Sequence, residues 1–304
     1  MQTSFNQKCL FACLVIFVNL IQSKNDGKTK TKDQIEMLQL LKRHDKSIYR
    51  FSSLSSAIEG RKKQKESKIE SINTVDYETQ ILKSFFKKAK TDAHILKSNE
   101  SNFSEVFSQY NVLHNQEKYK SVLKKYYELR EKYVEKGSIP LNKKEAFSFE
   151  LLEYIEAQDI AKENPIISII FLAINQIIDN KYIDNPCNVL KLKKGKSLDE
   201  NIHNIYSDLS IPNLISRLEF EGKGDIKITF LTLDKALSSY MEIFKFNYIS
   251  EIKKNTGYLK LHQVEVEIQS KLIRSFFKNL FENWEASKNN SHSISSTKPS
   301  NKTE

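Results

Sequence analysis

The chain is poor in glycine and proline, the two residues that most often end helices and form tight turns. Its 304 residues include only 7 Gly and 5 Pro. Long regular elements with few turns are therefore expected. The scarcity of glycine also counts against Rossmann, P-loop and barrel enzymes, because their ligand loops need glycine where the backbone approaches a phosphate.

The residues of common catalytic and metal sites are also sparse. None of the 6 His lies four residues from another, so helix-borne zinc pairs are absent, and there is no Cys-x-x-Cys, P-loop or nucleophile elbow. We therefore expect a protein that is not an enzyme and has no cofactor or metal. Catalytic groups can be scattered along a chain, so an enzyme of unrecognised type is kept as the third-ranked hypothesis.

The N-terminus carries the most specific motif in the sequence. Lys8 precedes an apolar run from Cys9 to Ile21, and Gln22-Ser23 lead into a polar stretch. A basic start, an apolar run of this length and a small residue at its end are typical of a secretory signal peptide. We expect residues 1–23 to be removed and the protein to be secreted into the extracellular space. The alternative is an uncleaved signal anchor, for which the run is short.

Loss of that segment would leave a basic chain with a single thiol. Cys9 and Cys13 would leave with it, so the mature chain keeps only Cys187 and has no internal disulfide. We expect Cys187 to be a free thiol on or under a loop; the alternative is pairing with another chain. The formal net charge would fall from +10 to +9 with the loss of Lys8. A basic protein favours polyanionic partners.

The most apolar stretch of the remaining chain covers residues 164–178. It is apolar on all sides, so it needs either lipid or protein around it. It is shorter than the roughly 20 residues of a membrane span. Asn164 suits a helix N-cap and Pro165 the first helical position. We predict a buried central helix here, and no membrane span in the mature chain.

Most other segments show a single apolar stripe, which predicts helices packed around this centre. The predicted fold is all-α, an irregular multi-helix bundle. Helices are expected over 33–60, 74–97, 104–136 and 257–286, with capping boxes at Asn142–Glu145 and Ser197–Glu200. Residues 225–233 fit either a strand or a helix, and a small β-hairpin near 217–232 is an alternative. Spacing over 115–136 also permits a coiled coil, although few heptads are sustained.

The predicted domain plan has one main unit. Residues 24–32 are expected to be disordered, 33–286 to form a single helical domain, and 287–304 to be a disordered tail. The loop at 180–197 is the alternative boundary between two subdomains.

Three basic clusters fit a heparin-type pattern, two basic residues followed by any residue and a third basic one. Closely spaced lysines bind a polyanion by releasing its counterions. The alternative is an ordinary solvated surface. The cluster at 193–196 is the preferred site because it is predicted in a loop. The candidate residues are Arg61, Lys62, Lys63, Lys65, Lys87, Lys88, Lys90, Lys193, Lys194 and Lys196.

Four Asn-x-Ser/Thr sequons lie in predicted joints or tails, where a secreted chain could accept a glycan. They are Asn99, Asn102, Asn289 and Asn301.

The profile of signal peptide, basic charge, scarce cysteine and helical texture resembles the mosquito 34-kilodalton salivary secreted protein family. It is also similar to secreted surface and wall proteins of microsporidia and apicomplexan parasites. Both resemblances imply a protein of saliva or of a parasite surface that acts on a host. They carry no residue over to this chain. We therefore expect a secreted, non-enzymatic effector that binds a host protein or a glycosaminoglycan, without specific nucleic-acid binding. A structural or adhesive surface protein is the alternative.

Overall fold

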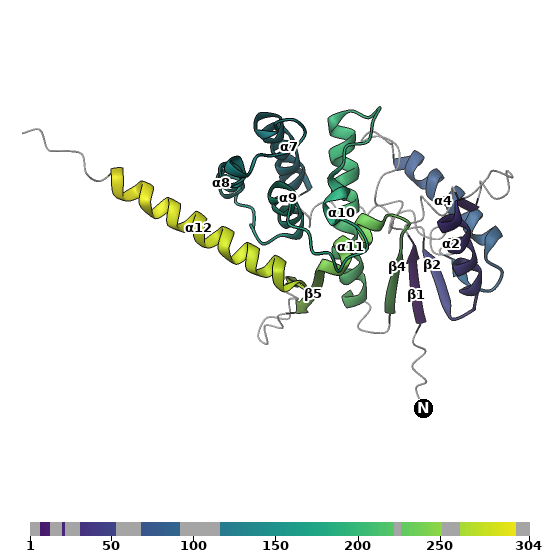
Figure 1. Cartoon of the computed structure of the whole chain (residues 1–304). Coiled ribbons are helices and arrows are strands. Elements are labelled where there is room, and N and C mark those ends of the chain that lie inside the picture. Colours follow the sequence, from purple (N-terminus) through teal and green to yellow (C-terminus); the bar gives the residue numbers. More distant parts are fainter. Residues whose placement is uncertain are drawn as a thin grey trace, which may run out of the picture.

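The computed structural model describes residues 7–12, 20–21, 31–52, 68–91, 116–221, 226–250 and 262–295. Eight α-helices lie in these residues: α2 (Lys32–Arg43), α4 (Lys68–Phe85), α7 (Gln116–Tyr133), α8 (Leu141–Ala157), α9 (Pro165–Asn175), α10 (Leu198–Glu221), α11 (Lys235–Ile243) and α12 (Lys271–Ser295). The short strands are β1 (Gln7–Ala12), β2 (Tyr49–Ser52), β3 (Lys90–Thr91), β4 (Ile226–Leu231), β5 (Phe244–Ser250) and β6 (His262–Ile268). A 3-10 helix, η1 (Pro186–Leu190), precedes α10. The described residues are mostly helical, which confirms the predicted fold class (Figure 1).

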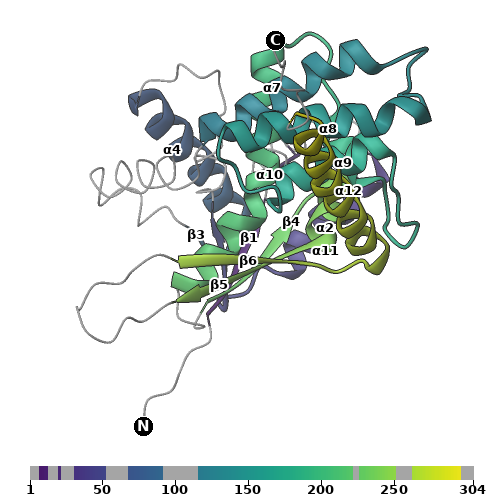
Figure 2. The same cartoon turned by 90° about the vertical axis from the view of Figure 1, so that its left-hand side faces the viewer.

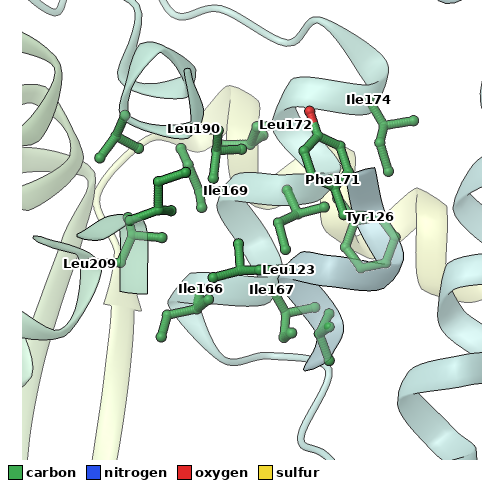
Figure 3. Close-up of a cluster of buried hydrophobic side chains, with 14 of the residues drawn as sticks. Leu123, Tyr126, Ile166, Ile167, Ile169, Phe171, Leu172, Ile174, Leu190 and Leu209 are labelled. Atoms are coloured by element: carbon green, nitrogen blue, oxygen red, sulfur yellow. The ribbon is translucent and has the colours of Figure 1, made fainter. Parts of the chain in front are cut away.

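Helix α9 lies at the centre of the larger of two hydrophobic cores. The Asn164 side chain caps it by accepting a hydrogen bond from the Ile166 N–H at 2.9 Å, and Pro165 opens it. Phe171 and Leu172 are fully buried, and side chains from α7, α10 and η1 surround them (Figure 3). The prediction of a buried central helix is confirmed. Within the described ranges, no helix is long and apolar enough to cross a membrane.

A four-stranded parallel sheet stands beside α10, in the order β3-β2-β1-β4 (Figure 1). Strand β1 is internal, with Lys8–Phe11 paired to β2 and Gln7–Ala12 paired to β4. The sequence did not predict this sheet. Its central strand is part of the apolar run that reads as a signal peptide.

The smaller core lies where this sheet meets α2 and α4. Phe51 of β2 stacks on Phe86 with 3.8 Å between ring centroids. Leu20 and Ile21 are buried in the same cluster, 3% and 2% exposed. Removal of residues 1–23 would therefore separate β2 from β4 and take two side chains out of this core.

Two predicted helices end earlier than expected. The helix predicted over 33–60 ends at Arg43, and β2 follows it because Tyr49–Ser52 pair with β1. The helix predicted over 74–97 spans Lys68–Phe85 instead. In both cases pairing with a neighbouring strand overrides the local helical pattern.

The antiparallel hairpin lies further along the chain than predicted. Phe244 pairs with Ile268 and Lys245 with Glu267, so β5 and β6 form it. Residues 217–221 belong to α10. Within the ambiguous stretch 225–233, residues Ile226–Leu231 form the strand β4 and not a helix. The predicted capping box at Asn142 is wrong, since α8 begins after Pro140 without a side-chain cap.

Helix α12 docks on the larger core through Trp284. The indole Nε1–H donates to Glu156 Oε1 of α8 at 3.0 Å, and Lys288 Nζ donates to Glu156 Oε2 at 3.0 Å. Figure 2 shows α12 crossing in front of α9 and α11. The helix reaches Ser295, so the tail predicted as disordered from 287 begins as helix.

Candidate polyanion-binding surface

The loop between η1 and α10, residues 191–197, is called the basic loop from here on. One side chain, Asn201 in the first turn of α10, holds its backbone. The Lys193 N–H donates to Asn201 Oδ1 at 2.7 Å. Asn201 Nδ2 lies 3.3 Å from the carbonyl oxygens of Lys193 and Lys196, and 3.0 Å from that of Ser197. Asn201 is 4% exposed, so these contacts are shielded from water.

Both ends of the basic loop are also fixed. The Tyr127 hydroxyl donates to the Leu190 carbonyl oxygen just before it. At the other end Ser197 and Glu200 form the predicted capping box, with each backbone N–H donating to the other side chain. Gly195 has φ +79, a left-handed conformation that suits glycine. The loop therefore has one defined backbone path.

The lysine side chains of this loop lie on the surface. Lys193, Lys194 and Lys196 are all exposed. Three ammonium groups thus sit within four residues on a backbone that is already ordered. Binding of a partner would therefore not lose the conformational entropy of that backbone.

The second basic cluster lies in a turn between α4 and β3, not on a helix as predicted. Lys87 and Lys88 are exposed in this turn, and Lys90, the first residue of β3, is exposed beside it. The backbone N–H groups of Lys87, Lys88 and Ala89 all donate to the Asp45 carboxylate, at 2.9, 2.8 and 2.8 Å. Successive N–H groups that converge in this way form an anion-binding nest. Here the anion is a side chain of the same protein.

The nest keeps Asp45 ionised. Partial burial opposes ionisation, but the three N–H groups and the Lys88 charge together outweigh it, so the pKa of Asp45 lies below its ordinary value. Because Asp45 precedes β2 and the nest precedes β3, this contact fixes the ends of two paired strands.

Asparagine at position 45 is expected to weaken that contact. Asp45→Asn should lower the free energy of unfolding by about 1–2 kcal/mol at pH 7, since charge-assisted bonds to a half-exposed group are lost. A depressed folded pKa contributes stability above the unfolded value of about 3.9 and loses it as pH falls through the folded pKa. The difference measured by urea unfolding should therefore shrink in acid. Asp76→Asn, an exposed change on α4, is the control; equal losses from both would contradict this role.

The two described basic clusters lie at opposite ends of the sheet. The 87–90 turn precedes β3 and so lies at the amino edge. Only residues 222–225 separate α10 from β4, and the two pack side by side, so they run in opposite directions (Figure 1). The basic loop at the start of α10 therefore lies toward the carboxyl edge. The structure does not join these clusters into one surface.

Several predicted site residues lie outside the described part of the chain. These are Arg61, Lys62, Lys63 and Lys65, and the sequons Asn99, Asn102 and Asn301. Asn289 is exposed, but it lies on α12 instead of in a tail.

Cys187 lies in η1, close to the main core. It is half-buried, with Sγ 4.0 Å from the Ile169 carbonyl oxygen. Burial raises the pKa of its thiol to about 12. A protonated thiol is a poor nucleophile, which supports the interpretation of Cys187 as a free thiol under a loop.

Sequence reasoning found the lysines of the basic loop and the capping box at its end, but it missed Asn201, which holds the loop backbone. The Ser197–Glu200 capping box was a readable signal. Asp45 acts through backbone 42 to 44 residues further along the chain. Asn201 acts through backbone 4 to 8 residues before it, and no standard motif marks this contact.

Comparisons with known proteins give no relative: no family model, no curated protein and no solved structure matches this chain. The described residues also hold no group of three or more His, Cys, Asp or Glu side chains placed to bind a metal ion.

Proposed function

We propose that this is a secreted, non-enzymatic basic protein that binds a polyanion, such as a glycosaminoglycan, through the basic loop. The observation that carries the proposal is the ordered backbone of residues 191–197, which presents Lys193, Lys194 and Lys196 to solvent. Such lysines gain affinity by releasing counterions from a polyanion.

The role outside the producing cell is part of the same proposal. The apolar run from Cys9 to Ile21 supports export, as does the resemblance in profile to secreted proteins that act on hosts. A structural or adhesive surface protein is the second candidate. A soluble form in secreted fluid favours the effector, and an insoluble, crosslinked location favours the structural protein.

Removal of the three loop lysines should abolish most heparin retention. We expect the triple variant Lys193→Ala, Lys194→Ala and Lys196→Ala to elute at clearly lower salt. The dependence of log affinity on log salt should flatten by roughly two to three units, about 0.9 per lost ion contact. The matched control removes the same charge from the other turn, with alanine at Lys87, Lys88 and Lys90. Equal losses in both variants would show that only net charge matters and would remove the proposed site.

A second variant tests the ordered backbone of the basic loop separately from its lysine charges. Asn201→Ala keeps every lysine but frees the loop backbone, so heparin affinity should fall without a change in the salt slope. Unchanged affinity would show that the ordered backbone contributes nothing.

A further inference from the structure

An acidic side chain, Asp208, lies on the same helix that holds the backbone of the basic loop. Asp208 follows Asn201 by seven residues, which is two turns, so both lie on the same face of the helix. The loop lysines whose backbone Asn201 holds, Lys193 and Lys196, both act electrostatically on Asp208. Asp208 thus lies on the helix face whose first turn holds the loop proposed above to bind a polyanion.

Few contacts stabilise the negative charge of Asp208 at its partly buried position. It is half-buried and, within the part of the chain that the structure describes, makes no hydrogen bond and no close ion pair. Burial raises the pKa of its carboxyl to about 6, Lys193 and Lys196 oppose that shift, and Asp234 reinforces it. Asp234 is the N-cap of α11, where its side chain accepts from the Leu237 N–H at 3.0 Å. Lys193 and Lys196 lie in the loop before α10, and Asp234 lies at the start of α11, which packs against α10.

We propose that Asp208 is an internal competitor for the lysines of the basic loop, so that polyanion binding strengthens when this carboxyl becomes protonated. The proposal rests on the proposed function, because it assumes that the loop is the binding site. When ionised, Asp208 attracts Lys193 and Lys196 and lowers the positive potential that a sulfated ligand meets. When neutral, it leaves both ammonium groups to the ligand.

The sign of the effect follows from the same geometry. Between pH 7.5 and pH 5 the carboxyl takes up a proton, and the loop gains one unit of positive charge. We expect the loss of this one negative charge near the loop to raise the affinity for heparin roughly threefold to tenfold at low salt. The protein would therefore hold its polyanion more tightly in acid than at neutral pH.

The test is heparin affinity of the full chain at pH 5 and pH 7.5, for the wild type and for Asp208→Asn. The wild type should bind several-fold more tightly at pH 5. Asp208→Asn should bind tightly at both values and show a smaller change with pH. The other titratable groups are the same in both proteins, so the comparison rests on the difference between their two pH profiles. Asp199→Asn, an exposed change on the same helix, should keep the wild-type pH profile.

Thermal unfolding gives a readout that does not depend on ligand. A raised folded pKa means that the wild type loses stability as pH rises from about 4 through 6. The unfolding temperature of Asp208→Asn should therefore exceed that of the wild type by an amount that grows across this window.

The outcomes separate the two claims. The difference in unfolding temperature between the two proteins could grow with pH while their heparin affinities change in parallel. That result would overturn the competition but would not affect the proposed binding site. A constant stability difference would also overturn the competition, since Asp208 would not titrate there. If the triple lysine variant binds as tightly as the wild type, the proposed site fails, and the competition fails with it.

Discussion

A chain that begins at Lys24 is expected to keep its helical core and lose its parallel sheet. Among the described residues, the buried side chains of the larger core run from Val122 onward, and Tyr119 is the earliest partly buried side chain packed against them. The sheet depends on the N-terminal segment, because β1 is bonded to β2 on one side and to β4 on the other. Without β1, each neighbour exposes an unpaired edge.

Hydrogen exchange measures this directly. In the shortened chain, backbone amides of β2 and β4 should exchange rapidly, while amides of α9 keep their protection. Leu10→Pro in the full chain is the matched variant, since proline removes a backbone N–H from a central strand without shortening the protein. Protected β2 and β4 amides in both variants would contradict the role of β1.

Residues 1–23 belong both to the predicted signal peptide and, through β1, to the folded sheet. A signal peptide removed at Ser23 and an internal strand at 7–12 cannot both belong to one mature molecule. N-terminal sequencing of the protein from its natural source separates them. A mature chain that starts near Lys24 would have the helical core as its folded part, and one that retains Gln7–Ala12 would have the sheet as well.

Alanine at Phe171 is expected to cause the largest loss of stability of any single change considered. The side chain is fully buried in α9. Truncation of a buried phenylalanine costs about 3–5 kcal/mol, from lost burial and the cavity that remains. A domain of ordinary stability has only about 5–15 kcal/mol in total, so the variant should unfold at much lower urea concentration.

Ile183→Ala is the matched control for this change. Ile183 is 73% exposed, and a surface truncation should alter stability by no more than about 0.5 kcal/mol. The two variants are compared by urea midpoint at constant slope. A similar midpoint for both would show that α9 is not the centre of the core.

Local sequence signals predicted the elements whose causes are local. Helix α9 was predictable because its apolar residues surround it and Asn164-Pro165 mark its start. The start of α2 was readable too, since Thr31 and Gln34 form a capping box, but it was missed. The alternation of Phe244 and Phe246 with Lys245 was a readable signal for β5 as well, and it was also missed.

The sheet could not be predicted because a buried parallel strand and a signal peptide look alike. Both are short, continuous apolar runs. What distinguishes them is pairing with Tyr49–Ser52 and Ile226–Leu231, and sequence separation hides such contacts. The same reason hides the nest around Asp45, whose partners lie 42 to 44 residues further along the chain. In the candidate site, residue types were predictable and the contacts that organise them were not.

The docking of α12 places a single tryptophan where its fluorescence can follow unfolding. Trp284 is the sole tryptophan of the chain, and it lies 4% exposed between α12 and α8 with its indole bonded to Glu156. Tryptophan fluorescence, excited selectively over the tyrosines, therefore comes from a single place in the larger core. An emission curve would follow the loss of the helical core, while circular dichroism follows all helices at once. Divergence of the two curves would reveal whether the sheet and the helical core melt as one unit or as two.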